Sequence, residues 1–416
     1  MKVVHITYSD SGGAGIAVVR IHKALLEQGI ESRVLVAEKR SQEETIVLAN
    51  ESPDLVYTPP RNRVLRKLMK LMRNRGFLLS LREKYERKLN RIPFSQRTFF
   101  TSPLSRFDLA RHPLVKDADI VHLHWVANYI DFPSFFPSID KPIVWTLHDE
   151  NMAYGGFHYG KEKERCYTNY ASIEDAYCKI KQSSLSHCKS IHVVALSKMM
   201  KDFYATRSFL SDRCISIIHN GIDTSIFRVI DKSIGRQVYR IPKNNLVIVF
   251  CSVSLNDKRK GLADLLEAVA RLDREDVTVL CIGNGHYEGD TSLDVRYTGP
   301  ITNSDLLAMS YSCGDVFAFP SYQEAFAQTP LEAISCGLPI VAYPCSGMEE
   351  LINEHNGIMC DDFKTDSFYQ GLERVLGSTY DCLSLHEDIA RRFSIERIAS
   401  EYHKLYDSIL QSNPKS

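Results

Sequence analysis

Short, continuous apolar runs that alternate with helical patterns constrain the fold of this chain more than any other feature. Such runs cover residues 2–8, 32–37, 119–125, 142–147, 190–196, 246–252, 277–282, 316–319 and 339–342. A run that is apolar at every position is typical of a strand in a parallel sheet covered on both faces. Residues 16–28, 262–272 and 304–312 have the spacing of crossover helices. The sequence therefore predicts an α/β fold with doubly wound parallel sheets.

The chain is long enough for more than one such domain. At roughly 150 residues per domain, its 416 residues allow two or three. Because residues 227–245 are polar and carry little periodicity, we expect the boundary there, between Rossmann-like domains over 1–228 and 229–393. The last segment, 394–416, begins with one amphipathic helix. Ligands of such sheets bind at the carboxyl ends of the strands, and two domains that face each other form a cleft.

Charge and hydropathy narrow the class of protein. Lys+Arg and Asp+Glu both number 51, so the net charge favours no partner, and we expect no nucleic acid. No run of about 18 apolar residues could span a bilayer, and the first residues lack the pattern of a secretory signal. We therefore expect a cytoplasmic protein, either in solution or peripheral on the inner face of the cell membrane.

The eleven cysteines are scattered along the chain, several of them inside apolar runs. Buried free thiols in a reducing cytoplasm explain this usage. Cys166, Cys178 and Cys188 cluster in sequence with His158 and His187, but their spacings match no CxxC pair. We expect no metal there and leave a structural role of these cysteines open.

Two further groups resemble metal ligands. His122 and His124 point to the same face of one predicted strand, and His148 follows the next strand, yet no carboxylate or cysteine completes the set. Asp117 and Asp119 spell the DxD of metal-dependent transferases but lie at the start of a buried strand, the end opposite to a ligand. The sequence therefore predicts no metal site.

Residues 61–91 interrupt the alternating pattern. They hold twelve Lys and Arg against two Glu, interleaved with apolar residues at helical spacing. A basic amphipathic helix is typical of segments that contact an anionic membrane surface. The alternative is a helical hairpin that packs on its own domain.

Two glycine-rich loops follow predicted strands. Gly13 and Gly15 open a helix after the first strand, where glycine lets backbone N–H groups approach a phosphate. The dinucleotide pattern GxGxxG fails there, because Val18 occupies the third position. Around Gly283 it fails again, because Glu288 occupies that position. Both failures disfavour a nicotinamide dehydrogenase.

The strongest signal is the segment 320–341, PSYQEAFAQTPLEAISCGLPIV, which begins where a predicted strand ends. Thr329 is placed to cap a helix that has Pro330 at its first position and ends at Gly337. A helix N-terminus at this place suits a diphosphate. Glu332, in the first turn, is placed to accept two hydroxyls from a ribose. Glu324, in the preceding loop, is placed to meet a transferred sugar.

This segment resembles the E-x7-E signature of the retaining glycosyltransferases of family 4, which have the two-domain GT-B fold. In that family the first glutamate contacts the donor sugar and the second contacts the nucleotide ribose. The resemblance implies transfer of a hexosyl group from a nucleotide-diphosphate sugar, with no cofactor, to a glycan or a lipid-linked acceptor. The leaving phosphate helps to deprotonate that acceptor, and no protein nucleophile is implied.

Other matches to the family cover nearly the whole chain. Lys258-Arg259-Lys260-Gly261 resembles the motif that supplies cations to the diphosphate. The helix within 394–416 resembles the one that crosses back to the N-domain. Residues 119–125 and 146–149 resemble two characteristic strand ends, which implies that His148 is catalytic together with Glu324. The resemblance places Trp125 and Asp149 on the acceptor side, although Asp149 could instead orient His148 or cap a turn. The implied donor-binding residues are Gly13, Gly15, Arg259, Lys260, Gly283, Phe326, Ala327, Gln328, Thr329 and Glu332.

The chain departs from the family pattern in three places. Residues 251–254 lack the arginine that many relatives carry, so either Arg259 supplies that cation or the diphosphate is held more weakly. Ser346 stands where relatives often have glycine. Residues 155–159, GGFHY, look like the GGCHY of a subgroup in bacterial polysaccharide assembly, with Phe157 in place of the cysteine. Two alternatives follow: a nucleotide-sugar hydrolase or epimerase on the same fold, and a decayed sugar-binding protein.

Overall fold

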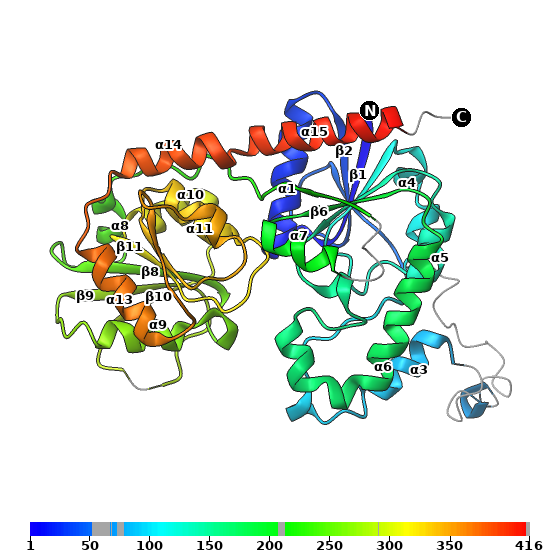
Figure 1. Cartoon of the computed structure of the whole chain (residues 1–416), viewed down its shortest axis with the longest axis horizontal. Helices are drawn as coiled ribbons and strands as arrows, with labels where there is room; N and C mark the ends of the chain where they lie inside the picture. The colour runs from blue at the N-terminus through cyan, green and yellow to red at the C-terminus, as the bar shows by residue number, and fades with distance from the viewer. Residues whose placement is uncertain (52–66, 68, 73–78, 207–212, 290, 413–416) are drawn as a thin grey trace. The chain divides into compact units, whose positions relative to one another are not determined.

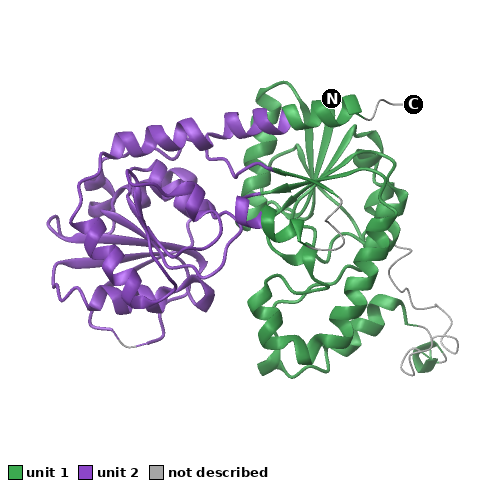
Figure 2. Cartoon of the chain, viewed as in Figure 1, with its two compact units in different colours: residues 1–195, 201–216, 404–416 green, residues 196–200, 217–403 purple. Residues whose placement is uncertain are grey.

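A computed structural model describes residues 1–51, 67, 69–72, 79–206, 213–289 and 291–412 (Figure 1). By its internal contacts the chain divides into two compact units (Figure 2). Unit 1 comprises Met1–Ala195, Lys201–Ser216 and Lys404–Ser416, and unit 2 comprises Leu196–Met200 and Ile217–His403.

Unit 1 is built on a seven-stranded sheet of order β3-β2-β1-β4-β5-β6-β7, in which the pairs from β3 to β6 are parallel. Its strands are β1 (Lys2–Ser9), β2 (Glu31–Glu38), β3 (Ile46–Leu48), β4 (Ile120–Leu123), β5 (Ile143–Leu147), β6 (Ile191–Ala195) and β7 (Cys214–Ile217). Its helices are α1 (Gly12–Glu27), α3 (Leu81–Leu89), α4 (Pro113–Asp117), α5 (Phe132–Ser138), α6 (Gly160–Ser186) and most of α7 (Lys198–Ala205). All residues of β4 and β5 are buried, as their apolar runs predict.

Unit 2 repeats this architecture with a parallel sheet of order β10-β9-β8-β11-β12-β13. Its strands are β8 (Leu246–Ser254), β9 (Val277–Asn284), β10 (Asp294–Gly299), β11 (Val316–Phe319), β12 (Ile340–Ala342) and β13 (Gly357–Met359). Its helices are α8 (Lys232–Val238), α9 (Leu262–Ala270), α10 (Ser304–Ser312), α11 (Gln328–Ser335), α12 (Met348–Leu351), α13 (Thr365–Leu376), α14 (Cys382–Phe393) and the first half of α15 (Ile395–Ser412).

Both sheets have a topological switch point. The first strand of each sheet, β1 or β8, lies between the next strand and a later one, so the strand order reverses beside it. In open α/β sheets this is where ligands bind, outside the carboxyl ends of the strands. The two parallel sheets confirm the predicted fold class. A ligand site of either unit is expected at the carboxyl end of its strands, beside β1 or β8.

The chain passes between the two units more than once, and none of these crossings lies at the expected 228/229 boundary. The chain enters unit 2 at Ile217, because the following residues bond to that unit: Ile222 N donates to Phe393 O at 2.9 Å. Residues 196–200 also belong to unit 2. From Lys404 onward the last helix belongs to unit 1, where Tyr406 OH and His122 Nδ1 form a hydrogen bond of 2.7 Å.

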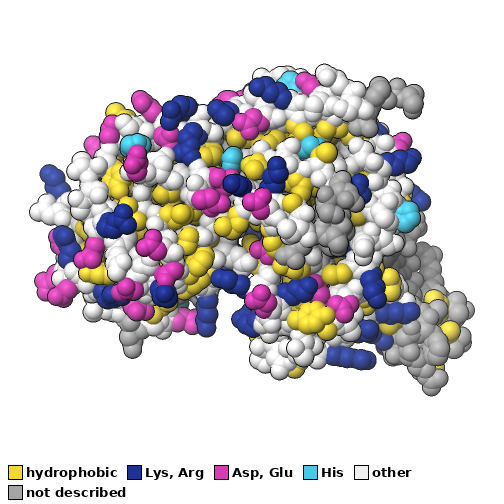
Figure 3. All heavy atoms as spheres, in the orientation of Figure 1, with side chains coloured by type: hydrophobic (Ala, Val, Ile, Leu, Met, Phe, Trp, Pro, Cys, Tyr) yellow, Lys and Arg dark blue, Asp and Glu magenta, His cyan; other side chains and the backbone are white. Residues whose placement is uncertain are grey.

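Part of the basic segment 61–91, namely residues 61–66, 68 and 73–78, lies outside the described residues, and its described end forms α3. Tyr85 of α3 packs edge-on against Tyr177 of α6, with ring centroids 5.0 Å apart, and Leu89 joins the same cluster. These apolar side chains of α3 are therefore used within unit 1, as the hairpin alternative predicts. On the face in Figure 3, Lys and Arg are interspersed with Asp and Glu. Among the described helices, none is both long and apolar enough to cross a membrane.

Candidate active site

The loops that follow β8 and β11 meet at the switch point of unit 2. After β8 the chain forms the short 3-10 helix η5 (Lys258–Lys260) and turns at Gly261, whose φ is +73°. A Cβ atom on Gly261 would lie 2.1 Å from the carbonyl oxygen of Pro320, so only glycine allows this close approach. The approach brings the ammonium group of Lys260 onto the carboxylate of Glu324 as an ion pair. Ser321 Oγ donates to the same carboxylate oxygen at 2.7 Å.

Arg259 binds the loop that carries Glu324. Its guanidinium donates to Gln323 O at 2.9 Å and pairs with Asp257 at 3.1 Å, while its carbonyl accepts from Tyr322 N at 2.9 Å. These contacts tie η5 to the loop after β11, so Arg259 positions both loops. Its expected role as a second cation for a diphosphate stays a prediction.

Helix α11 begins earlier than the sequence predicts. Its N-cap residue is Ala327, in an extended conformation, and Thr329 is the second helical residue, so the predicted Thr329 cap is wrong. Pro330 is tolerated at the third position because the first-turn N–H groups have no partner inside the helix. Ala327 has no side-chain oxygen to accept from them, and the first turn holds no acidic residue. The N-terminus is thus available to an anion.

The earlier start moves Glu332 from the expected first turn into the second. Its side chain is buried, and Tyr311 OH donates to its Oε2 atom at 2.9 Å. Tyr311 comes from α10 and is itself fully buried. Cys251 belongs to residues 251–254, where many relatives carry an arginine. Burial raises the pKa of Cys251 to about 12, so its thiol is neutral and adds no charge beside Glu332.

Ser346 forms a hydrogen bond to the backbone of the loop that carries Glu324. Ser346 Oγ donates to Ala325 O at 3.0 Å and lies 2.7 Å from Ser197 Oγ. Asn220 Nδ2 donates to Phe326 O at 2.7 Å, which fixes the next residue of the loop. The departure from glycine at this position therefore adds hydrogen bonds to the loop backbone.

The glycines of the two glycine-rich loops differ in what they can do. Gly15 is buried, and a Cβ there would lie 2.5 Å from Ser9 O, so it allows α1 to pack on the end of β1. Gly283 similarly would bring a Cβ 1.8 Å from Ser252 O. Gly13 is exposed, with nothing within 4 Å of its Cβ position. Of the three, Gly13 has the backbone that a ligand can reach.

His148 lies directly after β5 in unit 1, and another histidine holds it. Its Nε2 atom is 3.2 Å from Nδ1 of His124, whose Nε2 is 3.0 Å from Nδ1 of His5. Burial lowers the pKa of His148 to about 4, so the ring is neutral at physiological pH. Sequence reasoning considered His124 only as a metal ligand and did not predict this row.

Asp149 does not orient His148. Its Oδ2 atom accepts from Trp125 Nε1 at 2.7 Å and from His158 Nδ1 at 2.6 Å, and its Oδ1 accepts from Asn151 N at 2.9 Å. Burial alone would raise the pKa of Asp149, but His158 and these hydrogen bonds hold it below its usual value. Trp125 and Asp149 thus contact each other, and their expected place on the acceptor side stays a prediction.

Comparison with known proteins agrees with this geometry. Residues 11–226 match the family described as Glycosyltransferase Family 4, and residues 245–378 match the one described as Glycosyl transferases group 1. The first match alone covers more than half of the chain. The chain belongs to glycosyltransferase family 4.

Relatives of this family 4 chain are distant in sequence. An N-acetylgalactosaminyltransferase of Campylobacter jejuni, named for its N,N'-diacetylbacillosaminyl-diphospho-undecaprenol substrate, is 27% identical over 37% of this chain and 43% of its own length. The chain spans about half the length of the curated relatives it matches. Sucrose-phosphate synthase of Thermosynechococcus elongatus has a TM-score of 0.66 at 16% identity, covering 99% of this chain and 100% of that one. HepE of Anabaena, solved with UDP, has a TM-score of 0.63 at 16% identity, covering 98% and 100%. These structures confirm the GT-B fold.

The family 4 chain contains one histidine group, among its described residues, that is compact enough to hold a metal ion. The nitrogens of His5, His122 and His124 lie within 4.8 Å of one another. Both nitrogens of His122 bond to hydroxyls, at 2.7 Å to Tyr406 and 2.8 Å to Thr146. Hydrogen bonds therefore engage both ring nitrogens of His122.

The other residues that resemble metal ligands in the sequence, Asp117, Asp119 and the cysteines, have structural contacts. Asp119 accepts from the backbone N of Lys2 at 2.8 Å, and Asp117 pairs with the Lys2 side chain at 2.9 Å, both at the amino end of β4. Cys166 packs in an aromatic cluster with Phe157, which fills the place of the subgroup's cysteine. All eleven cysteines are free.

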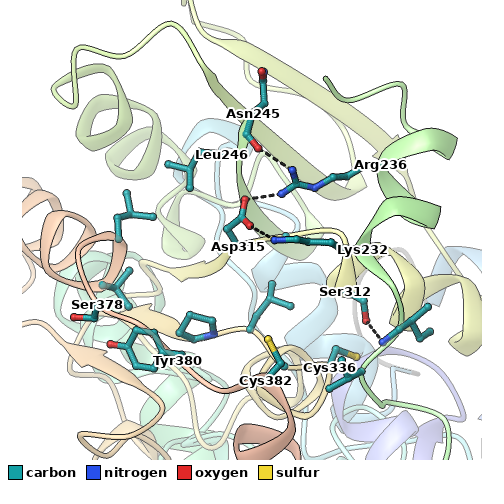
Figure 4. Close-up of a pocket in the computed structure, with 18 of the residues that line it drawn as sticks. Lys232, Arg236, Asn245, Leu246, Ser312, Asp315, Cys336, Ser378, Tyr380 and Cys382 are labelled. Atoms are coloured by element: carbon teal, nitrogen blue, oxygen red, sulfur yellow. Dashed lines mark hydrogen bonds and ion pairs between the residues drawn. The ribbon is translucent and has the colours of Figure 1, made fainter. Parts of the chain in front are cut away.

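A cavity of about 690 Å³ lies at the other end of the unit 2 sheet (Figure 4). Leu246 at the start of β8, Asp315 before β11 and Pro339 before β12 line it. Arg236 and Lys232 both pair with Asp315, at 2.6 and 3.0 Å (Figure 4). Because these are the amino ends of the strands, the cavity is not where a doubly wound sheet binds its ligand.

The buried histidines make the stability of this family 4 chain depend on pH. Burial holds the pKa of His5, His122 and His124 well below the usual 6.5, so the unfolded chain binds more protons below that pH. Stability is therefore fully present above pH 6.5 and falls as the pH drops, by about 1.4 kcal/mol per pH unit for each histidine.

Urea unfolding between pH 7 and pH 5 measures this slope. The His122→Gln variant should reduce the slope by one histidine's share. The Asn244→Gln variant, which changes an exposed side chain that does not titrate, should leave the slope unchanged. Identical slopes for wild type and His122→Gln would contradict the prediction.

Proposed function

We propose that this chain transfers a hexosyl group from a nucleotide-diphosphate sugar to a glycan or lipid-linked acceptor in cell-surface polysaccharide biosynthesis, with retention and without a metal ion. The observation that carries the proposal is the ion pair of Lys260 and Glu324 just before the N-terminus of α11. It brings together, at the switch point of unit 2, a cation for a diphosphate and a carboxylate for sugar hydroxyls.

Donor binding changes the partner of Lys260. Its side chain and that of Glu324 are 21% and 12% exposed, so both remain within reach of a ligand. A diphosphate carries more negative charge than a carboxylate and also interacts with the N–H groups of α11. Lys260 therefore turns to the diphosphate, and Glu324, still held by Ser321, accepts hydrogen bonds from the sugar. Glu332, held by Tyr311, accepts from the ribose.

The family resemblance implies retention, and the same groups support the proposed transfer without a metal ion. The departing diphosphate gains negative charge in the transition state, and Lys260 with the α11 N-terminus stabilises that charge without a metal. The acceptor attacks the face that the nucleotide leaves, and the leaving phosphate helps to take its proton. His148, at the end of β5, contacts the sugar.

The acceptor is proposed to be lipid-linked or a glycan. The Campylobacter relative is named for a diphospho-undecaprenol substrate, and the GGFHY motif looks like that of a polysaccharide-assembly subgroup. A membrane-bound acceptor also gives the basic segment 61–91 a role, as a contact with an anionic surface of the inner face of the membrane.

A thermal-shift panel tests the donor proposal. A ligand that binds the folded chain at 100 times its Kd adds about 2.7 kcal/mol of stability. We expect nucleotide diphosphates and at least one nucleotide sugar to raise the Tm, without added metal and in the presence of a chelator. Nucleosides serve as controls and should not. If no nucleotide diphosphate or nucleotide sugar shifts the Tm, the proposal fails.

Vesicle co-sedimentation tests the membrane contact. Changing Arg66, Lys67, Lys70 and Arg73 to Ser should weaken binding to vesicles that contain phosphatidylglycerol, because each basic residue near an anionic surface contributes about 1 kcal/mol. The matched control removes four exposed arginines of unit 2: Arg271, Arg274, Arg391 and Arg397. Equal sedimentation of wild type and the 66–73 variant would contradict the proposed membrane contact.

A further inference from the structure

Three imidazoles of unit 1 bond end to end, from the middle of β1 to the end of β5. The contacts are His5 Nδ1 to His124 Nε2, at 3.0 Å, and His124 Nδ1 to His148 Nε2, at 3.2 Å. His5 is fully buried and His124 is 2% exposed, whereas His148 is only partly buried. The row therefore connects the interior of the sheet with the strand end that carries a predicted catalytic residue.

Only two proton arrangements satisfy both contacts. A neutral imidazole carries one N–H, and each contact needs one donor and one acceptor, so all three rings must donate in the same direction. Either every ring donates toward His5 or every ring donates toward His148. The first arrangement puts a hydrogen on Nε2 of His5, and the second leaves that atom as a bare acceptor.

The environment of His5 Nε2 decides between them. This atom is buried and has no hydrogen-bond partner among the described residues. Buried N–H groups without an acceptor are rarer in proteins than buried acceptors without a donor. His5 Nε2 is therefore unprotonated, His5 Nδ1 donates to His124, and His124 Nδ1 donates to Nε2 of His148. The remaining hydrogen of His148 lies on Nδ1, to which no described protein group bonds.

We propose that His5 and His124 are positioning residues that hold His148 in its Nδ1–H tautomer, so that His148 presents a hydrogen-bond donor and not a base at the end of β5. A free neutral imidazole prefers the opposite tautomer, so the row reverses the intrinsic preference. The use of this donor rests on the proposed function: Nδ1–H donates to an oxygen of the transferred sugar. No described hydrogen bond links Asp149 to His148, because the Asp149 carboxylate accepts from Trp125, His158 and Asn151 instead.

The tautomer is measured directly in the full chain labelled with 15N-histidine. Long-range proton–nitrogen correlation spectra distinguish protonated from unprotonated ring nitrogens, and the signals missing from the His148→Gln variant identify His148. We expect a protonated Nδ1 and an unprotonated Nε2 in the wild type at pH 7.5. A protonated Nε2 on His148 would overturn the proposal without any further variant.

Two variants test the part played by His124. Glutamine can accept from His5 and donate to His148, so His124→Gln should keep the His148 tautomer. Leucine can do neither, so His124→Leu should shift His148 toward the Nε2–H form. An unchanged pattern in His124→Leu would contradict the positioning role. Zn²⁺ bound at one equivalent to His5, His122 and His124, seen by metal analysis and by loss of their unprotonated nitrogen signals, would replace this explanation.

Kinetics separate this inference from the proposed function. With an active nucleotide sugar, His124→Leu should lower kcat/KM by about 10-fold, the value of one hydrogen bond, while the Tm shift caused by the nucleotide diphosphate stays as in wild type. His124→Gln should retain near wild-type kcat/KM. A wild-type chain that transfers no sugar but shows the Nδ1–H tautomer would refute the proposed function and leave the positioning role standing.

Discussion

Replacing Lys260 by alanine should lower kcat/KM for sugar transfer by about 100- to 1,000-fold, the typical effect of removing one group that stabilises transition-state charge. Lys260 is the cation that the structure holds at the carboxylate of Glu324, and the proposed donor would develop charge on its departing diphosphate at that point. The loss should appear in kcat as well as in KM, because the interaction strengthens as the bond breaks.

Lys258 provides the matched control for this prediction. It lies on the same short helix η5 but is exposed, and it differs from Lys260 in contacting no acidic residue of the loop after β11. Lys258→Ala should therefore keep kcat/KM within about 3-fold of wild type, since one exposed charge contributes little. Equal losses in the two variants would mean that only the general positive charge of η5 matters.

The Gly261→Ala variant should lose donor binding and stability together. Two effects add at this position: an alanine must adopt a φ of +73°, and its Cβ would lie 2.1 Å from Pro320 O. The loops after β8 and β11 must separate, which pulls Lys260 away from Glu324. We expect a loss of about 1–3 kcal/mol of unfolding free energy beyond the φ strain, and a nucleotide-induced Tm shift that is largely abolished.

Gly299 isolates the conformational part of this effect. It has the same φ of +73°, but nothing lies within 4 Å of its Cβ position. Gly299→Ala should therefore lose only the strain of a left-handed alanine, about 1–2 kcal/mol, and should retain the nucleotide-induced Tm shift. If Gly261→Ala were no less stable than Gly299→Ala, the close contact of the two loops would not be required.

The sequence predicts the sheets well, and it predicts that Lys260 and Glu324 lie at one edge of a sheet, because both predictions depend on local patterns. Continuous apolar runs mark β4, β5, β8 and β11 within one or two residues. The loops that carry Lys260 and Glu324 follow two of those strands, so the parallel topology alone brings them to one edge. The prediction of the helix start was wrong. Thr329 is a residue type that commonly caps helices, yet α11 has its N-cap two residues earlier, at Ala327.

Contacts between residues distant in sequence could not be predicted. His5 meets His124 only because β1 and β4 are neighbours in register, and a single sequence does not contain that register. Ser346 reads as a departure from a family pattern, but its hydroxyl bonds to Ala325 and Ser197. The hydrogen bond from Tyr311 to Glu332 could not be predicted either, because it depends on the packing of α10 beside α11.

The return of the last helix to unit 1 has a consequence for the order in which the chain can fold during synthesis. Domains generally fold as units as the N-terminal part emerges first, yet Tyr406, which bonds to buried His122, is made after all of unit 2. A nascent chain ending near residue 216 therefore holds the whole unit 1 sheet with His122 still lacking that partner. Released chains that end before residue 404 and released full-length chains should therefore differ in the protease resistance of β4, because the native packing of the sheet needs the final segment.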